Sequence, residues 1–267
     1  MTYNSPYTKD DFLRDDRGPH IWCPQCGIRP SIQCFAGALA QTGIDRDKIV
    51  VVSGIGCAGR IAGYMYCDSF HATHGRAIPF ATGVKLANPD LTVVVFSGDG
   101  DLFAIGGNHF IHATRRNIDI SVFCINNGVY GMTGGQSAPT THVGAWTATS
   151  PYGNCEPPFN LPHLAESCGA VYVARWTPAY TDELTQSMRE AIQTRGFSFV
   201  EIVTPCPTNY VRYNPTVNTG SKEHTRIDHS ADVHSLQYSC EAQLVVGTFV
   251  RRQRPVFEVQ QNNRTQT

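Results

Sequence analysis

The feature that most constrains the fold is a set of short, wholly apolar segments that stop abruptly at glycine. Residues 91–97 (LTVVVFS) run into Gly-Asp-Gly at 98–100, and residues 49–53 (IVVVS) run into Gly54. Segments that are apolar at every position, and not only at every second one, are typical of strands in a parallel sheet that is covered on both faces. The sequence therefore predicts an α/β fold.

Helical segments alternate with these strands along most of the chain. We expect strands at residues 49–53, 91–97, 120–125, 170–175 and 197–204, and helices ending near residue 66 and at 77–87, 102–115, 161–167 and 182–195. This alternation predicts a doubly wound, mostly parallel sheet with helices on both faces. We divide the chain into an N-terminal arm (1–48), a central α/β domain (49–206) and a C-terminal tail (207–267). The long segment 127–158 is expected to be a functional loop.

The composition of the chain indicates which kinds of partner to expect. The 267 residues are 41% hydrophobic, which is enough for a large core, and the net charge of −1 gives no reason to expect a nucleic-acid or membrane partner. We find no 18-residue apolar run and no signal-peptide pattern, so the expected location is the cytoplasm. Charged residues make up only 16% of the chain, which indicates that partner chains cover part of its surface.

Asp99 and Asn127 follow consecutive strands, 28 residues apart. Because the carboxyl ends of parallel strands meet at one edge of a sheet, we expect both side chains at the same rim. Carboxylate, amide and carbonyl oxygens suit Mg²⁺, which completes its coordination with phosphate oxygens. Gly98 and Gly100 let the backbone approach a phosphate closely, and a helix starting near Asp101 offers free N–H groups. The pattern predicts a magnesium–diphosphate site.

The tripeptide at 98–100, followed at this interval by Asn126-Asn127, resembles the fingerprint of thiamine-diphosphate-dependent enzymes. The resemblance implies that Asp99, Asn127 and the carbonyl of Val129 hold Mg²⁺. The structural alternative is that the first motif is only a turn and that Asn126-Asn127 only caps a strand.

Four of the ten cysteines would surround a metal at this rim if the N-terminal arm folds over the predicted sheet. Cys23 and Cys26 form a C-x-x-C pair in the arm, Cys57 follows the first strand, and Cys206 follows the last predicted strand of the central domain. Four thiolates fit either a structural zinc or a 4Fe–4S cluster. We favour the cluster, because an electron-carrying metal beside a thiamine ring has a use.

Six segments carry a resemblance to one family: WCPQCG, SGIGCAGR, HATHGRAIPFATGVKLANP, FSGDGDLFAIGGNHFIHATRRN, INNGVYGMTGGQ and TPCPTN. They span about residues 22–210 and resemble the β subunits of 2-oxoacid:ferredoxin oxidoreductases. The resemblance implies a thiamine-diphosphate-binding fold and one 4Fe–4S cluster on Cys23, Cys26, Cys57 and Cys206. It also implies coenzyme A-dependent oxidative decarboxylation of a 2-oxoacid, in either direction, with ferredoxin as the electron carrier.

The resemblance also assigns individual residues. Arg60 is expected to bind the substrate carboxylate, which favours 2-oxoglutarate, converted to succinyl-CoA and CO₂, over pyruvate or another 2-oxoacid; otherwise Arg60 is a surface side chain. The residues expected to contact the cofactor are Ile55, Gly56, Cys57, His74, Gly98, Asp99, Gly100, Asp101, Asn127, Val129, Gly131, Met132 and Thr133. The glycine-rich residues 131–136 are expected to close over the diphosphate, or else to form a mobile loop without catalytic contacts. The other cysteines are expected to be packing or surface thiols: Cys34, Cys67, Cys124, Cys155, Cys168 and Cys240.

No glutamate precedes Glu156. Thiamine enzymes need a glutamate that hydrogen-bonds the aminopyrimidine, and we expect a separate α subunit to supply it, in an αβ or α₂β₂ assembly. We therefore assign no catalytic residue to this chain. Two other functions stay open: a thiamine-dependent decarboxylase or carboligase subunit with a structural zinc, and a non-catalytic electron-transfer module.

Overall fold

The computed structural model describes residues 5–236 and 243–257. One eight-stranded sheet forms its centre, in the order β2-β1-β3-β4-β8-β7-β10-β9, and β5 pairs with β6 in a small hairpin. The strands are β1 Ile49–Ser53, β2 Asp68–His71, β3 Thr92–Gly98, β4 Ser121–Asn126, β5 Val129–Tyr130, β6 Gln136–Ser137, β7 Tyr172–Trp176, β8 Ser198–Val203, β9 Thr225–Ile227 and β10 Leu244–Arg251. In the main sheet, the neighbouring strands β2, β1, β3, β4, β8 and β7 pair in parallel, and β10 runs antiparallel to β7.

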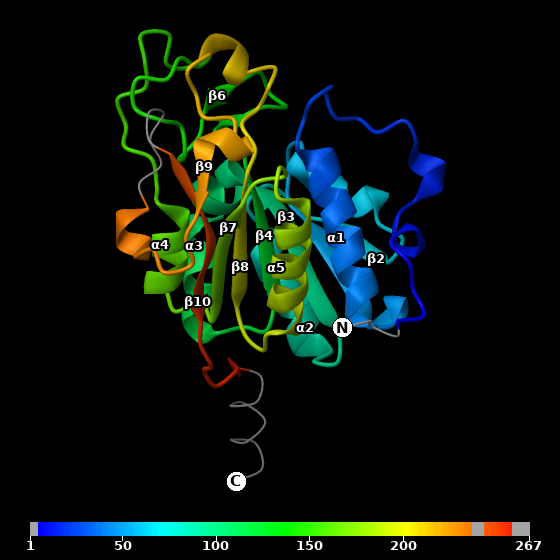
Figure 1. Cartoon of the computed structure of the whole chain (residues 1–267). Coiled ribbons are helices and arrows are strands. Elements are labelled where there is room, and N and C mark those ends of the chain that lie inside the picture. Colours follow the sequence, from blue (N-terminus) through cyan, green and yellow to red (C-terminus); the bar gives the residue numbers. More distant parts are fainter. Residues whose placement is uncertain (1–4, 237–242, 258–267) are drawn as a thin grey trace.

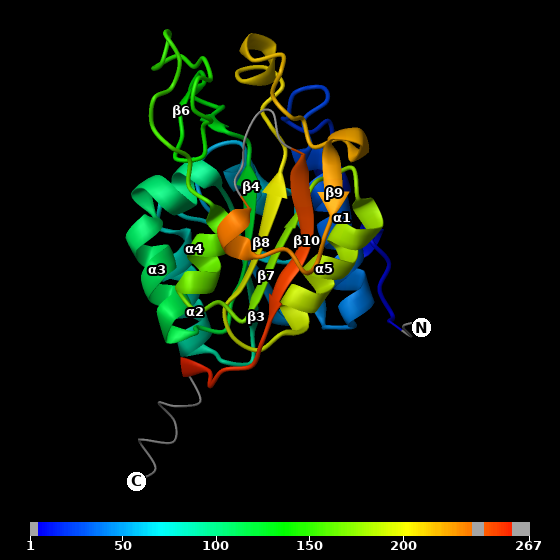
Figure 2. The same cartoon turned by 60° about the vertical axis from the view of Figure 1, so that its left-hand side comes forward.

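Helices cover both faces of the sheet, as Figure 2 shows. The helices are α1 Ile28–Thr42, α2 Ala77–Ala87, α3 Gly107–Arg116, α4 Leu161–Ser167 and α5 Thr181–Gln193. Alternate strand side chains enter two separate apolar clusters: Val94 and Phe96 pack with α1 and α5, whereas Val93 and Val95 pack with α2 and α3. Both sides of each central strand are therefore buried, and the predicted doubly wound, mostly parallel fold is confirmed.

Two predicted helices differ in form. The segment expected to be helical up to residue 66 is a 3₁₀ helix, Ala58–Tyr64. The helix expected at 102–115 is divided into a π-helical turn, Asp101–Ile105, and α3. The N–H of Gly106 donates to the carbonyl of Asp101 at 2.9 Å, five residues back. The wide turn keeps Asp101 at the sheet edge while α3 starts in a new register.

The arm and the tail share the core of the central domain. In α1, Ile28, Ile32, Phe35 and Leu39 are buried, and the helix packs against α5. β10 extends the main sheet, and β9 pairs with it. The boundaries at residues 48 and 206 stay predictions, but both flanking segments add to one hydrophobic core.

Short 3₁₀ turns complete the described chain. They lie at Asp10–Phe12, Asp15–Arg17, Arg46–Lys48, Val211–Tyr213, Lys222–His224 and Val233–Ser235. No helix of residues 5–236 and 243–257 is long and apolar enough to cross a membrane.

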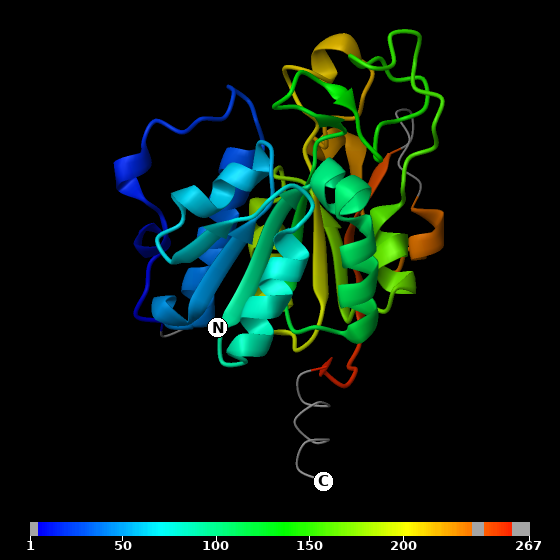
Figure 3. The ribbon, with the colours of Figure 1, turned by 180° about the vertical axis from the view of Figure 1, so that it is seen from behind.

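The strand order reverses between β1 and β3, because β2 lies on one side of β1 and all later strands lie on the other. Such a switch point opens a crevice at the carboxyl ends of the strands. The loop that contains β5 and β6 lies over this end, as does the segment after β8 (Figures 1 and 3).

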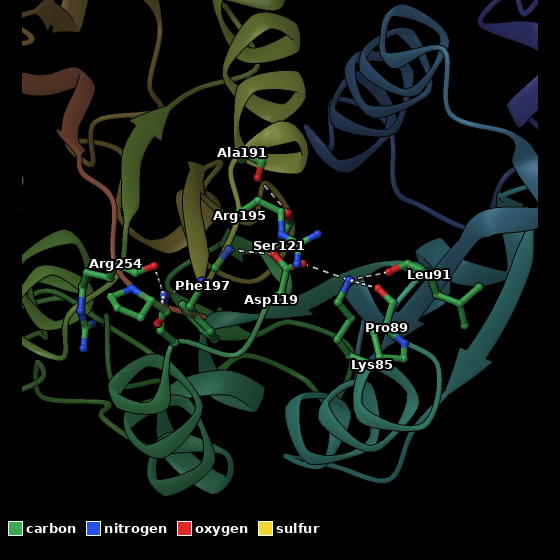
Figure 4. Close-up of polar contacts among 12 residues, drawn as sticks. Lys85, Pro89, Leu91, Asp119, Ser121, Ala191, Arg195, Phe197 and Arg254 are labelled. Atoms are coloured by element: carbon green, nitrogen blue, oxygen red, sulfur yellow. Dashed lines mark hydrogen bonds and ion pairs between the residues drawn. The ribbon is translucent and has the colours of Figure 1, made fainter. Parts of the chain in front are cut away.

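The opposite end of the sheet is held by a buried lysine (Figure 4). Lys85, at the end of α2, donates to the carbonyls of Pro89 at 2.9 Å and Leu91 at 2.7 Å. Its ammonium lies 3.0 Å from the Asp119 carboxylate, which also pairs with Arg195 at 3.2 Å. These contacts join the connections that enter β3, β4 and β8.

Candidate active site

Asp99 is buried where β3 ends. Its Oδ2 accepts a hydrogen bond from the N–H of Gly128 at 3.1 Å and another from the Thr140 hydroxyl. Burial raises the pKa of the Asp99 carboxyl to about 6, against the opposing effect of these donors. A carboxylate held in a buried site by neutral donors favours a cation, so the site suits a divalent metal.

The loop after β4 lies beside Asp99, because the N–H of Gly128 in this loop donates to the Asp99 carboxylate. The carbonyl of Asn127 accepts from the N–H of Cys206 at 3.0 Å, and its side-chain oxygen accepts from the N–H of Val129 at 3.2 Å. The carboxylate of one strand end and the amide loop of the next are thus brought together. This donor set fits Mg²⁺, which prefers oxygen ligands.

Asp101 is the centre of a second group of contacts. Its Oδ1 accepts from the N–H of Ile55 at 3.2 Å, from the N–H of Gly75 at 2.8 Å and from Nδ1 of His74. Its Oδ2 accepts from the Ser97 hydroxyl at 2.5 Å. A carboxylate can only accept, so Nδ1 of His74 carries the hydrogen. One buried side chain therefore ties together the segments after β1, before α2 and at the end of β3.

The two glycines of the Gly98-Asp99-Gly100 motif are needed for different physical reasons. A Cβ on Gly98 would meet only the carbonyl of Ile125, at 3.9 Å, so the space beside it is open to a ligand. A Cβ on Gly100 would overlap the ring of Tyr130, whose hydroxyl donates to the Gly100 carbonyl at 3.3 Å. The backbone at Gly98 is thus open to the close approach of a phosphate that was expected at both glycines. At Gly100 the absence of a side chain makes room for the ring of Tyr130.

The four cysteines predicted as metal ligands lie near one another. Burial raises the pKa of the Cys57 thiol to about 11, and three neighbouring thiols add to the rise: Cys206, Cys26 and Cys23. Burial likewise raises the pKa of Cys26, and the thiols of Cys206 and Cys23 again contribute. A metal that binds all four would stabilise the thiolates and remove this cost.

Gly131 marks where the thiols and the Asn127 loop meet. A Cβ built on it would lie 3.3 Å from Sγ of Cys206, 3.5 Å from Nδ2 of Asn127 and 3.9 Å from Sγ of Cys57. Cys23 and Cys26 line part of a hollow of about 500 Å³. In the part of the chain that the structure describes, no three His, Cys, Asp or Glu side chains form a preassembled metal group.

The other predicted site residues lie around the same rim. Arg60 is exposed on the 3₁₀ helix after Cys57, and Ile55 and Met132 are also exposed. The Thr133 hydroxyl donates to Oε1 of Gln136 at 2.6 Å, inside the β5–β6 hairpin. Among the cysteines outside the predicted ligand set, Cys34 and Cys124 are buried, Cys67 and Cys168 are partly buried and Cys155 is exposed, whereas Cys240 lies outside the described residues.

Sequence reasoning missed two residues that complete this rim, Thr140 and Asn209. Thr140 donates to Asp99, and Asn209 contacts Gly131 and Cys206. Their segments have no periodicity and no motif, so only Asn209, inside TPCPTN, had any signal near it. A cavity of about 620 Å³ between α5 and β10 contains none of the predicted site residues, and the rim remains the candidate site.

Comparison with known proteins identifies the family. A family model described as thiamine pyrophosphate enzyme, C-terminal TPP binding domain, matches residues 54–202. The chain is 48% identical over 250 residues to the 2-oxoglutarate synthase subunit KorB of Methanocaldococcus jannaschii, covering 92% of this chain and 93% of that one. It is 56% identical over 199 residues to subunit KorB of Archaeoglobus fulgidus, covering 74% of each chain. This chain belongs to the KorB family of thiamine pyrophosphate enzymes.

A solved structure supports the assignment to the KorB family. The 2-oxoglutarate:ferredoxin oxidoreductase from Magnetococcus marinus, with 2-oxoglutarate, coenzyme A and succinyl-CoA bound, superimposes with a TM-score of 0.87 and 29% identity, covering 98% of this chain and 90% of that one. The family model starts at Gly54, at the switch point, and ends inside β8. The Gly-Asp-Gly motif is thus part of a TPP-binding domain and not an isolated turn.

Proposed function

We propose that this KorB chain is the β subunit of a 2-oxoglutarate:ferredoxin oxidoreductase. The enzyme converts 2-oxoglutarate and coenzyme A to succinyl-CoA and CO₂, or runs in reverse, with ferredoxin as the electron carrier. The observation that carries the proposal is the meeting, around Gly131, of the Asn127 loop with the Cys57 and Cys206 thiols. Relatives named 2-oxoglutarate synthase subunits support the substrate.

Thiamine diphosphate, when bound, supplies the electron sink that decarboxylation of a 2-oxoacid needs. Asp99, Asn127 and the carbonyl of Val129 would hold the Mg²⁺ that binds the diphosphate. Gly98 leaves room for the phosphate oxygens, and Asp101 fixes the segments of Ile55 and His74 around the cofactor.

Cys23, Cys26, Cys57 and Cys206 hold a 4Fe–4S cluster in this proposal. The reaction releases electrons, and a cluster can carry them whereas zinc cannot. The thiols of Cys57 and Cys206 lie beside Gly131, as does the side chain of Asn127, so these residues would hold the cluster next to the magnesium loop.

Arg60 binds the distal carboxylate of 2-oxoglutarate. Its guanidinium is exposed at the rim, three residues after Cys57, and can grip a carboxylate with two hydrogen bonds. Pyruvate lacks that carboxylate, so replacing Arg60 with alanine should raise KM for 2-oxoglutarate more than KM for pyruvate.

An α subunit covers the rim and supplies the glutamate that activates the thiamine. The loop over the carboxyl ends exposes large apolar side chains that a partner would bury: Met132, Val143, Trp146 and Tyr152, the last with 97% of its surface exposed. Glu201, the glutamate nearest to the predicted metal loop in the sheet, is already paired with Arg175 at 2.6 Å.

Cysteine substitution in the assembled complex tests the cluster. Cys206→Ser and Cys23→Ser should each lose most of the iron and sulfide, the visible absorption that dithionite bleaches, and electron transfer to ferredoxin. Cys168→Ser is the matched control and should keep its iron, because Cys168 follows α4 and precedes β7, at the opposite end of the sheet. One zinc and no iron in the wild-type complex would contradict the proposal.

A further inference from the structure

Asn209 forms hydrogen bonds to two parts of the site that lie side by side at Gly131. Its backbone N–H donates to Sγ of Cys206 at 3.4 Å, and its side-chain Nδ2 donates to the carbonyl of Gly131 at 2.8 Å. Cys206 is a proposed cluster ligand, whereas Gly131 begins the glycine-rich loop at residues 131–136. One half-buried residue therefore binds a thiol with its backbone and this loop with its side chain.

The glycine-rich loop is fitted closely to Asn209. Gly135 has a φ of +89°, and a Cβ there would lie 2.9 Å from both Cβ and the carbonyl oxygen of Asn209. The N–H of Gly135 donates to the carbonyl of Tyr130 at 2.9 Å, which closes the loop on itself. The glycine-rich loop and the turn at residues 206–209 are thus packed directly against each other.

The same turn is anchored to the magnesium loop. The N–H of Cys206 donates to the carbonyl of Asn127, and the N–H groups of Tyr210 and Val211 donate to the carbonyl of Cys206 at 3.1 and 2.9 Å. The Cys206 backbone is therefore held by several hydrogen bonds, and Asn209 links this turn to the carbonyl of Gly131.

We propose that Asn209 is a positioning residue that couples the diphosphate loop to the iron–sulfur cluster, so that cofactor binding is felt at the Cys206 thiolate. Hydrogen bonds to ligating sulfur atoms set the reduction potential of such clusters. When the loop at residues 131–136 closes on the diphosphate, the Gly131 carbonyl holds Asn209, and the N–H···S bond keeps a fixed geometry. The inference rests on the cofactors of the proposed function.

The test uses the assembled complex and measures the cluster, not turnover. The cluster midpoint potential is titrated by electron paramagnetic resonance with and without thiamine diphosphate and Mg²⁺, and cofactor affinity is measured by equilibrium dialysis. Asn209→Ala keeps the backbone N–H but removes the Gly131 contact, and Asn209→Asp replaces the donor with an acceptor. Thr208→Ala, at an exposed neighbouring position, is the control.

In the wild type and in Thr208→Ala, adding the cofactor should shift the midpoint potential. In Asn209→Ala the iron content should be unchanged, the shift should be lost, and cofactor affinity should fall about five- to tenfold, the effect of one hydrogen bond. Asn209→Asp should also lose the shift, and it should lower the potential with or without cofactor because it adds negative charge.

Two results would overturn the inference: a wild-type potential that ignores the cofactor, or Asn209 variants that keep both the full shift and full affinity. If Asn209→Ala loses its iron, Asn209→Asp decides the question by the same criteria. Wild-type complex without iron or without thiamine diphosphate would instead refute the proposed function, and the inference with it.

Discussion

At the scale of single residues, Asp101 holds three segments of the rim with one carboxylate. Its four donors come from Ile55, His74, Gly75 and Ser97, and its charge strengthens each bond because the site is buried. The sequence marked this aspartate only as part of the diphosphate motif. Its hydrogen bonds show that it organises the protein segments that meet at this rim.

Asp101→Asn should weaken both stability and cofactor binding. An asparagine must turn its NH₂ group toward a donor, so the free energy of unfolding of the complex should fall by about 2 to 3 kcal/mol. Thiamine diphosphate should bind about tenfold more weakly, because a loss of about 1.4 kcal/mol of binding free energy raises the dissociation constant tenfold. Chemical denaturation and equilibrium dialysis measure both, with Asp90→Asn, an exposed position, as the control.

Asp99 predicts the pH dependence of cofactor binding. Burial raises its pKa to about 6, so below that pH the carboxyl holds a proton that Mg²⁺ must displace. Magnesium-dependent retention of thiamine diphosphate should therefore weaken as pH falls from 7 to 5. The cofactor-free complex should show the opposite sign for this group, because a raised folded-state pKa favours folding as pH falls.

Equilibrium dialysis from pH 5 to 7.5 checks this prediction. Asp99→Asn should bind the cofactor weakly and with little change over the same range. Retention in the wild type that does not vary with pH would show that Asp99 is not a ligand.

At the scale of elements, sequence patterns located the strands β1, β3, β4, β7 and β8 and the helices α2 to α5, but not α1 or the strands β2, β5, β6, β9 and β10. Residues 28–42 carry apolar side chains at helical spacing and end at Gly43, with a φ of +70°, so the signal for α1 was present beside the more conspicuous C-x-x-C pair. The edge strand β2 has four exposed residues and no apolar pattern. Its strand conformation is set by its parallel pairing with β1, which no local sequence pattern reveals.

The buried Lys85 at the amino end of the sheet gives a prediction that concerns the stability of the protein and not its activity. Lys85 is buried and joins α2, β3 and the start of β4 through Pro89, Leu91 and Asp119. Lys85→Ala should lower the free energy of unfolding by about 3 kcal/mol, because removing one partner of a buried pair leaves the other uncompensated. Iron and thiamine diphosphate content of the folded complex should not change.

Denaturant unfolding monitored by circular dichroism measures the effect of Lys85→Ala, and Lys48→Ala, at an exposed position, provides the baseline. Equal stability of the two variants would mean that this end of the sheet is held by other contacts.

At the scale of the whole molecule, the chain offers half of an active site. It presents the proposed metal ligands and thiols at a rim that is bordered by exposed apolar side chains, and it has no glutamate before Glu156. The purified chain alone should therefore show no coenzyme A-dependent reduction of a viologen dye by 2-oxoglutarate. Adding the α subunit should restore the activity, and robust turnover without it would contradict the assignment.

The sequence by itself determined the fold class and the identity of most rim residues. Apolar strands that end in Gly-Asp-Gly and Asn-Asn require a buried parallel sheet with polar groups at the strand ends, and this follows from local chemistry. Only the tertiary structure decided which groups each of those residues contacts. Whether Asp101 binds phosphate or four protein donors, and whether Gly100 yields to a ligand or to Tyr130, depends on which distant segments pack beside it. Contacts such as that of Asn209 with Gly131, 78 residues away, leave no periodic trace in the chain, because they are set by packing and not by local conformation.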